Sequence, residues 1–290
     1  MDRITKELVQ NWLPLREPDA HKGDFGRVLM IAGSKGMMGA CVLSCRSAFR
    51  SGSGLVAACC SPDLFSDVHA GVPEATCVSR EGVDPARYDA VAIGPGLGVS
   101  QENHGLICRV LAGYEGPAIL DADALNCLAK YGFPAAEGRK AHLVLTPHAG
   151  EAAKLLNGPS SAEVSANRET YGLQLAERLQ AVTVMKGSGS LICCPDGSVF
   201  QNTTGNAGMA TGGSGDVLTG MICSFAGQLA AQGAGPAEAA KRAAVCGVYL
   251  HGLAGDLAAK QWGTDGLMAS DLADYAALAR ESFTISSQTD

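Results

Sequence analysis

The sequence lacks the features that would mark a membrane, secreted or metal-binding protein. No uninterrupted apolar run reaches about 18 residues, so no transmembrane helix is expected. The start, MDRITKELVQNWLPL, has no basic region leading into an apolar stretch and so does not look like a secretory signal. None of the 11 cysteines has CxxC spacing, which favours small core residues in a reducing cytosol over metal ligands. These absences predict a cytoplasmic protein with no membrane segment.

Charge is also scarce, and it is mostly of one sign. Only 18% of the residues are charged, the net charge is −7, and no lysine or arginine cluster stands out. This argues against nucleic acid and anionic membranes as partners. A phosphorylated ligand stays possible, because backbone N–H groups bind phosphate without net positive charge.

What the chain has instead is apolar residues, at 47%, and 37 glycines. This composition predicts a large core with many tight turns. No linker, internal repeat or shift in composition divides the 290 residues. We therefore expect a single domain over residues 1–290, with the first 20 or so residues as a lead-in.

Short apolar runs alternate with helical patterns along most of the chain. The runs show no polar alternation, which is typical of parallel strands covered on both faces. Later, Asp196-Gly197 marks the turn of a hairpin, and helices follow it. The pattern predicts an α/β fold with three layers, αβα, around a mostly parallel sheet. The expected parallel strands are 27–33, 55–60, 89–94, 117–123, 142–147 and 182–187.

Polar or glycine-rich segments follow these strands, where ligands bind in open α/β sheets. The first of them, GSKGMMGA, lacks the Gly-Lys-Ser/Thr ending of a P-loop. Its glycines are either plain turn residues or allow a ligand to approach the backbone, with Ala40 at the start of a helix. The other segments are 94–98, 121–126, 146–151 and 186–190.

Several polar side chains in these segments have two interpretations each, one structural and one functional. His148 is either a structural residue or a ligand contact. Asp121 and Asp123 either cap the next helix or serve the site. Lys186 either simply ends its strand or meets a nucleotide.

The segment NAGMATGGSGDVLTG, residues 206–220, is stripped of large side chains until Asp216. Gly212, Gly213, Ser214 and Gly215 lead into a helix, so their N–H groups predict an anion hole for a phosphoryl group. Asp216 then either favours the helix dipole only or takes a proton from an attacking hydroxyl. The glycine lead-in favours the catalytic reading.

GSGD entering a helix resembles the anion-hole motif of ribokinase-like kinases. With the other motifs, the chain resembles a narrower family, the ADP- or ATP-dependent NAD(P)H-hydrate dehydratases, and the resemblance implies a ribokinase-like fold. The similar segments run in order from about His21 to the last helix: HKGDFGRVLMIAGSKGMMGA, GPGLG, DADALN, LTPHAGE, NAGMATGGSGDVLTG and HGLAGD.

The resemblance also implies a role for each matching residue. The hydrate would contact Ala40, Gly96 (rather than Gly98), His148 and Asp216, with Asp216 as the catalytic residue. The nucleotide would contact Lys186, Gly187, Ser188, Gly189, Ser190 and Gly215. Ser190 stands where the commoner family ending has threonine. Mg²⁺ is expected as a cofactor, but no residue is assigned as its ligand.

The implied reaction is dehydration of the S epimer of NADHX or NADPHX to NAD(P)H, a metabolite repair step by a lyase. ADP is the expected co-substrate, giving AMP and phosphate, and ATP is the less favoured donor. A homotetramer is expected by family analogy. Because only about twenty residues precede the match, an NAD(P)HX epimerase is expected to be a separate protein.

Two other functions fit parts of the same pattern. A kinase for a small vitamin-precursor alcohol would keep Asp216 and the glycines but release a stable phosphorylated product. A nucleotide sensor without activity would keep the cavity alone, and the intact Asp216 argues against it.

Overall fold

The computed structural model describes residues 1–14, 16, 19–134 and 138–284. The predicted lead-in includes residues 15, 17 and 18, which lie outside this set. The single-domain prediction likewise covers residues 135–137 and 285–290, which are not described.

Ten strands form one sheet in the described part of the chain, in the order β1-β10-β9-β8-β7-β6-β5-β2-β3-β4. Only β9 runs antiparallel to its neighbours, β8 and β10. The mostly parallel α/β sheet of the sequence analysis is therefore confirmed. The strands are β1 (Asp2–Arg3), β2 (Arg27–Ile31), β3 (Leu55–Cys60), β4 (Thr76–Ser79), β5 (Ala90–Ile93), β6 (Pro117–Leu120), β7 (His142–Leu145), β8 (Ala181–Met185), β9 (Leu191–Cys193) and β10 (Val199–Gln201).

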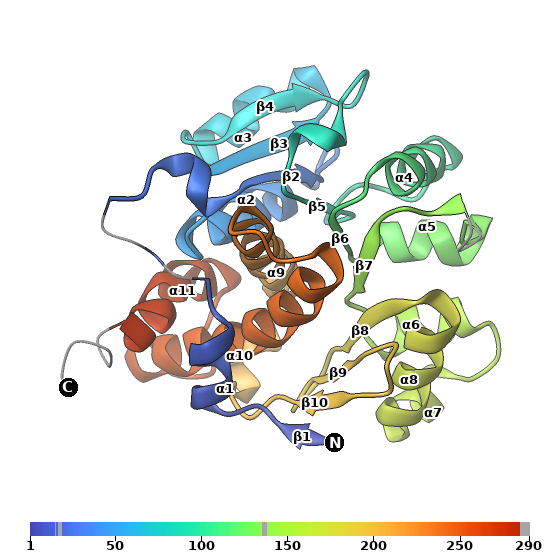
Figure 1. Ribbon diagram of the computed structural model, residues 1–290, viewed down its shortest axis with the longest axis vertical. Helices are drawn as coiled ribbons and strands as arrows, with labels where there is room; N and C mark the ends of the chain where they lie inside the picture. The colour runs from blue at the N-terminus through green and yellow to red at the C-terminus, as the bar shows by residue number, and fades with distance from the viewer. Residues whose placement is uncertain (15, 17–18, 135–137, 285–290) are drawn as a thin grey trace.

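Helices cover both faces of this sheet, as Figure 1 shows. Along β2, Val28 and Met30 pack on one face with α2, α9, α10 and α11, whereas Leu29 and Ile31 pack on the other with α4, α5, α6 and α8. The α-helices are α1 (Lys6–Trp12), α2 (Met38–Arg50), α3 (Phe65–Gly71), α4 (Gln101–Gly113), α5 (Asp123–Tyr131), α6 (Ala149–Leu156), α7 (Ser161–Ala166), α8 (Arg168–Leu179), α9 (Ser214–Ala231), α10 (Pro236–Trp262) and α11 (Ala269–Thr284). Among the described helices, none combines the length and apolar content needed to cross a bilayer.

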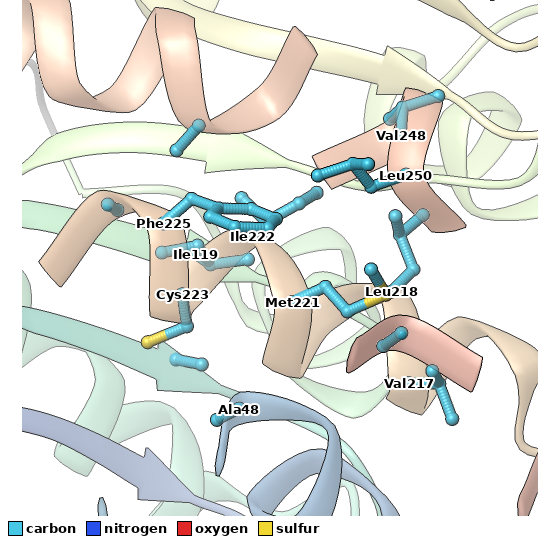
Figure 2. Close-up of a cluster of buried hydrophobic side chains, with 14 of the residues drawn as sticks. Ala48, Ile119, Val217, Leu218, Met221, Ile222, Cys223, Phe225, Val248 and Leu250 are labelled. Atoms are coloured by element: carbon cyan, nitrogen blue, oxygen red, sulfur yellow. The ribbon is translucent and has the colours of Figure 1, made fainter. Parts of the chain in front are cut away.

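Helix α9, which begins just before Asp216, lies inside the molecule. Every residue from Val217 to Leu229 is buried. Figure 2 shows Met221, Ile222 and Phe225 of this helix among side chains from α10 and the sheet. A mostly apolar helix that is buried on all sides belongs in a core, and the packing of α9 fixes the direction in which its N-terminus points.

Three sequence-based assignments differ from the structure. The analysis gave no strand to Asp2–Arg3, which pairs in parallel with β10, or to Thr76–Ser79, which pairs with β3. The third difference concerns helix α5, whose N-cap is Ala122, at φ 48°, with no side-chain cap bond. Capping by Asp121 or Asp123 was therefore wrong, because other groups bind both carboxylates.

Candidate active site

The loops after β2, β5, β6, β7 and β8 meet at the carboxyl edge of the sheet. There they surround the start of α9, where Gly213 is the N-cap at φ 92° and Asp216 lies in the first turn. A positive φ is favourable for glycine, so this turn explains why position 213 has no side chain. Ser44, from α2, donates to the backbone oxygen of Asp216 at 3.0 Å and ties the two helices together there.

Asp216 has an unusual charge environment. Burial, and after it the charge of Asp121, raise the pKa of the Asp216 carboxyl to about 6, and Lys186 opposes them. A carboxylate with a pKa near 6 is ionised at neutral pH and holds a proton better than an ordinary aspartate. Such a group is suited to general-base chemistry.

A buried ion pair lies directly beside Asp216. Lys186 Nζ donates to Asp121 Oδ1 at 2.7 Å and lies 3.8 Å from Glu151 Oε2. Burial disfavours the charge on Lys186, but the carboxylates of Asp121 and Glu151 outweigh it and raise the pKa of the ammonium. Thr219 Oγ1 donates to Asp121 Oδ2 at 2.9 Å. Asp121 therefore links the end of β6 to both β8 and α9.

Glu151 joins this network from the other side. Burial raises the pKa of the Glu151 carboxyl, against the opposing effect of Lys186. Its Oε2 accepts the backbone N–H of His148 at 2.9 Å, and the His148 ring accepts the N–H groups of Gly150 and Glu151 at Nδ1. These bonds form a capping box at the start of α6. His148 thus has a structural role, and its side chain is still 58% exposed.

The structure brings together Ala40 and Gly96, two of the residues assigned to the hydrate. Gly96 has φ 59°, and a Cβ there would lie 2.6 Å from the Met37 backbone oxygen and 3.1 Å from Ala40 Cβ. The backbone of Gly98 is already engaged, because its N–H donates to Asp123 Oδ2 at 2.8 Å. The Gly96 backbone oxygen likewise accepts from Ser34 Oγ at 2.8 Å, and the hydrate contacts of Ala40 and Gly96 stay predictions.

The residues assigned to the nucleotide line one cavity of about 420 Å³. All five residues from Lys186 to Ser190 face it, as do Ser214 and Gly215 at the start of α9. Apolar side chains of Met209, Leu218 and Val248 also line it, as do polar side chains of Asn202, Thr204, Asn206 and His251. A concave site that combines apolar surface with convergent polar groups is typical of a small-molecule site. Ala40, Gly96, His148 and Asp216 lie outside this lining.

The predicted anion hole has free backbone donors at the start of α9. The first turn of any helix leaves N–H groups without intrahelical acceptors. Among the described residues, the N–H groups of Gly215 and Asp216 donate to no acceptor outside the helix. Gly212 and Gly213 form the turn before the helix, and Ser214 and Gly215 are its first two residues.

Sequence reasoning missed two residues that support the site. Thr219 lies three positions after Asp216, and the available signal was a polar side chain one turn after the predicted catalytic acid. Arg168 Nη2 donates to the Ser188 oxygen at 2.7 Å, and its Nη1 would lie 2.6 Å from a Cβ on Gly187. No sequence signal connects Arg168 to the loop, because 20 positions separate it from Ser188.

The chain is similar to known proteins in both sequence and structure. A sequence model described as NAD(P)H-hydrate dehydratase matches residues 28–277. A bifunctional NAD(P)H-hydrate repair enzyme of Moorella thermoacetica is 41% identical over 94% of this chain. The chain spans 52% of that relative's length. An ADP-dependent (S)-NAD(P)H-hydrate dehydratase of Bacillus subtilis is 37% identical, with 93% of this chain and 94% of that protein covered.

Solved structures agree with the sequence matches. A crystal structure of the Bacillus subtilis ADP/ATP-dependent NAD(P)H-hydrate dehydratase, co-crystallised with ATP and Mg²⁺, has a TM-score of 0.86 and 34% identity, covering 97% of this chain and 98% of that one. A ribokinase-like superfamily protein of Enterococcus faecalis has a TM-score of 0.81 and 28% identity, covering 98% and 96%. The ribokinase-like fold is thus confirmed, and the chain belongs to the NAD(P)H-hydrate dehydratase family.

Proposed function

We propose that this protein dehydrates the S epimer of NADHX or NADPHX to NAD(P)H and converts ADP to AMP and phosphate. The observation that carries the proposal is the placement of Asp216, whose pKa is raised to about 6, at a helix start that opens into the cavity lined by Lys186–Ser190. Membership of the family supports the same reaction. The names of the Bacillus subtilis relatives support ADP, with ATP as the second donor.

The first step is phosphoryl transfer. Asp216 takes the proton of the hydroxyl on the hydrated nicotinamide ring, and that oxygen attacks the terminal phosphorus of ADP. The new O–P bond forms as the bond to the AMP oxygen breaks. The N–H groups at the start of α9 stabilise the negative charge on the transferring group.

The second step is elimination. The ring nitrogen lone pair expels phosphate from the ring carbon, and the neighbouring carbon loses a proton as the double bond forms. Phosphate is a far better leaving group than hydroxide. This difference gives a dehydratase a reason to use a kinase scaffold.

The carboxylates beside Lys186 do not fit a magnesium ion. Mg²⁺ takes oxygen ligands and is usually held by one or two carboxylates together with phosphates and water. Among the described residues, no group of three or more His, Cys, Asp or Glu side chains could hold a metal. Both oxygens of Asp121 accept hydrogen bonds, from Lys186 and Thr219, and Glu151 Oε2 accepts the His148 backbone N–H, so we assign the ion no protein ligand and derive no step through it.

The remaining proposals concern organisation. We propose one domain, because all ten described strands belong to one sheet. A cytoplasmic location and a homotetramer are proposed by family analogy, and sedimentation velocity tests the tetramer.

The direct test is incubation with the S epimer of NADPHX and ADP or ATP. We expect absorbance of the reduced nicotinamide to rise, with one AMP and one phosphate formed per NADPH when ADP is the donor. Omitting nucleotide should abolish the rise. A stable phosphorylated product without phosphate release would instead identify a small-molecule kinase, and no turnover with either donor would overturn the proposal.

A further inference from the structure

The motif HGLAGD, residues 251–256, has no assigned role in the reaction above. It lies in the middle of α10, a long helix that packs against α9. His251 and Gly252 line the nucleotide cavity, opposite the loop 186–190. Two further positions of the motif contact the segment that covers the cavity.

His251 is a buried imidazole in the cavity wall. It is 8% exposed, and its Nε2 lies 3.4 Å from the Ser214 hydroxyl, next to Gly215. The other ring nitrogen, Nδ1, makes no side-chain hydrogen bond within the described part of the chain. Burial lowers the pKa of His251 to about 4, although the backbone of Ser214 favours the charged form. The ring is therefore neutral at pH 7, with one nitrogen to donate and one to accept.

Asp256, five positions further along α10, holds a loop that lines the cavity. Its carboxylate accepts the Gly205 backbone N–H at 2.9 Å and the Asn206 amide at 3.0 Å. Gly205 and Asn206 both line the cavity. These two hydrogen bonds to the Asp256 carboxylate fix the position of Gly205 and Asn206.

The glycines of the motif allow this close contact. A Cβ on Gly252 would lie 2.2 Å from Thr204 Oγ1, and a Cβ on Gly255 would lie 2.4 Å from Met209 Sδ. Neither distance is compatible with a side chain in the present arrangement. A single helix thus provides a polar side chain in the cavity wall, His251, and a carboxylate that holds the loop, Asp256. It also has two glycines, Gly252 and Gly255, that let the loop approach closely.

We propose that the 251–256 segment is a wall of the nucleotide site, with His251 as a hydrogen-bonding contact of the bound nucleotide and Asp256 as the residue that positions the covering loop. The inference rests on the proposed nucleotide-dependent function. His251 lies between the helix start, where phosphate is expected, and the apolar side chains of Leu218 and Val248, which suit a purine. Its ligand is thus the nucleoside portion of ADP or ATP.

Calorimetric titration with ADP tests His251 without needing turnover. His251→Leu removes both ring nitrogens and should weaken ADP binding by a few-fold to about tenfold, the effect of one lost neutral hydrogen bond. His251→Gln keeps a donor and an acceptor and should recover part of the affinity. His69→Leu, in α3, is the matched control. Circular dichroism and thermal melting confirm that each variant is folded.

A second readout separates contact from general damage to the fold. Binding of NADPH, the product, should stay unchanged in His251→Leu, because the hydrate contacts lie outside the cavity lining. Asp256→Asn keeps one acceptor oxygen and should raise the KM for ADP several-fold while kcat at saturating ADP stays within about twofold. Asp274→Asn, which breaks the ion pair with Arg46, is its control.

Each outcome has a distinct meaning. If wild type binds ADP and both His251 variants bind it equally well, the inference is wrong. If ADP and NADPH affinity fall together, His251 acts on the fold and not on the nucleotide, which also overturns it. If wild type binds neither ADP nor ATP, the proposed function fails together with the inference. If ADP binding depends on His251 but the protein does not dehydrate NADPHX, the inference about the 251–256 segment is supported. In that case only the dehydratase proposal is contradicted.

Discussion

Lys186 donates to Asp121 at 2.7 Å across the floor of the site, from the end of β8 to the end of β6. This pair decides much of the local electrostatics. A Cβ on Gly215 would lie 3.4 Å from Lys186 Nζ and 3.7 Å from Asp121 Oδ2, so the pair lies against the start of α9. Lys186 was assigned to the nucleotide from the sequence. In the structure it lines the nucleotide cavity and is also bonded to a carboxylate that raises the pKa of Asp216.

Asp121→Asn should move the pH dependence of turnover. The negative charge of Asp121 helps to raise the pKa of Asp216 to about 6, so its removal should lower that pKa. The acid limb of the kcat profile, which reports ionisation of the base, should shift to lower pH. Asp123→Asn is the matched comparison, because Asp123 has a smaller effect in the same direction. An unchanged midpoint, or one that rises, would contradict this account.

Asp216→Asn should reduce turnover by roughly 10²–10⁴-fold, the usual contribution of a positioned acid or base. The amide has nearly the same shape as the carboxylate, so nucleotide binding and folding should persist. The measurement is kcat with NADPHX and ADP, with circular dichroism as the folding control. Turnover near that of wild type would remove Asp216 as the base.

The same variant should change the pH dependence of stability. The folded-state pKa of Asp216 is about 6, above the ordinary aspartate value of 3.8, so the folded state binds the proton more tightly. Asp216 therefore favours folding at low pH, and this contribution is lost as pH rises from about 4 to 6. Relative to wild type, Asp216→Asn should gain up to about 3 kcal/mol in unfolding free energy between pH 3 and pH 7. Urea unfolding across this range checks it, and a constant difference would argue against the raised pKa.

Gly215→Val should weaken nucleotide binding more than folding. The added methyl groups would extend towards Lys186 and into the cavity, where phosphate is expected to approach the backbone. Gly113, at the end of α4, has open space around it, so Gly113→Val is the matched control. Calorimetry with ADP should show a loss for the first variant only. Equal ADP affinity in both would exclude the Gly215 backbone from the nucleotide site.

The sequence alone was sufficient to predict those elements whose structure is determined by a local pattern of residues. The apolar runs at 27–33 and 142–147 predicted buried parallel strands, and Asp196-Gly197 predicted the hairpin. The strand at Asp2–Arg3 could not be found, because two exposed residues become a strand only by pairing with β10. The two interpretations of Asp121 stayed open in the sequence for a similar reason. A carboxylate beside a helix start suggests a cap, whereas its partners Lys186 and Thr219 lie 65 and 98 positions away.

His148 has two roles, and the last prediction separates them. Its ring caps α6, so His148→Ala should destabilise the protein by about 1 kcal/mol as well as remove a ring that is predicted to contact the hydrate. His148→Asn retains a good N-cap and removes the ring, so it is the sharper variant. We expect the Asn variant to melt close to wild type and to bind NADPHX a few-fold to about a hundredfold more weakly, within the range for one hydrogen bond to a neutral or a charged group.

ADP affinity of the His148 variants should change little, because Lys186–Ser190 and Gly215 line the nucleotide cavity without His148. Paired titrations with NADPHX and ADP provide the measurement. If ADP binding falls while hydrate binding holds, His148 belongs to the nucleotide half, and the division of the site between its two ligands is wrong.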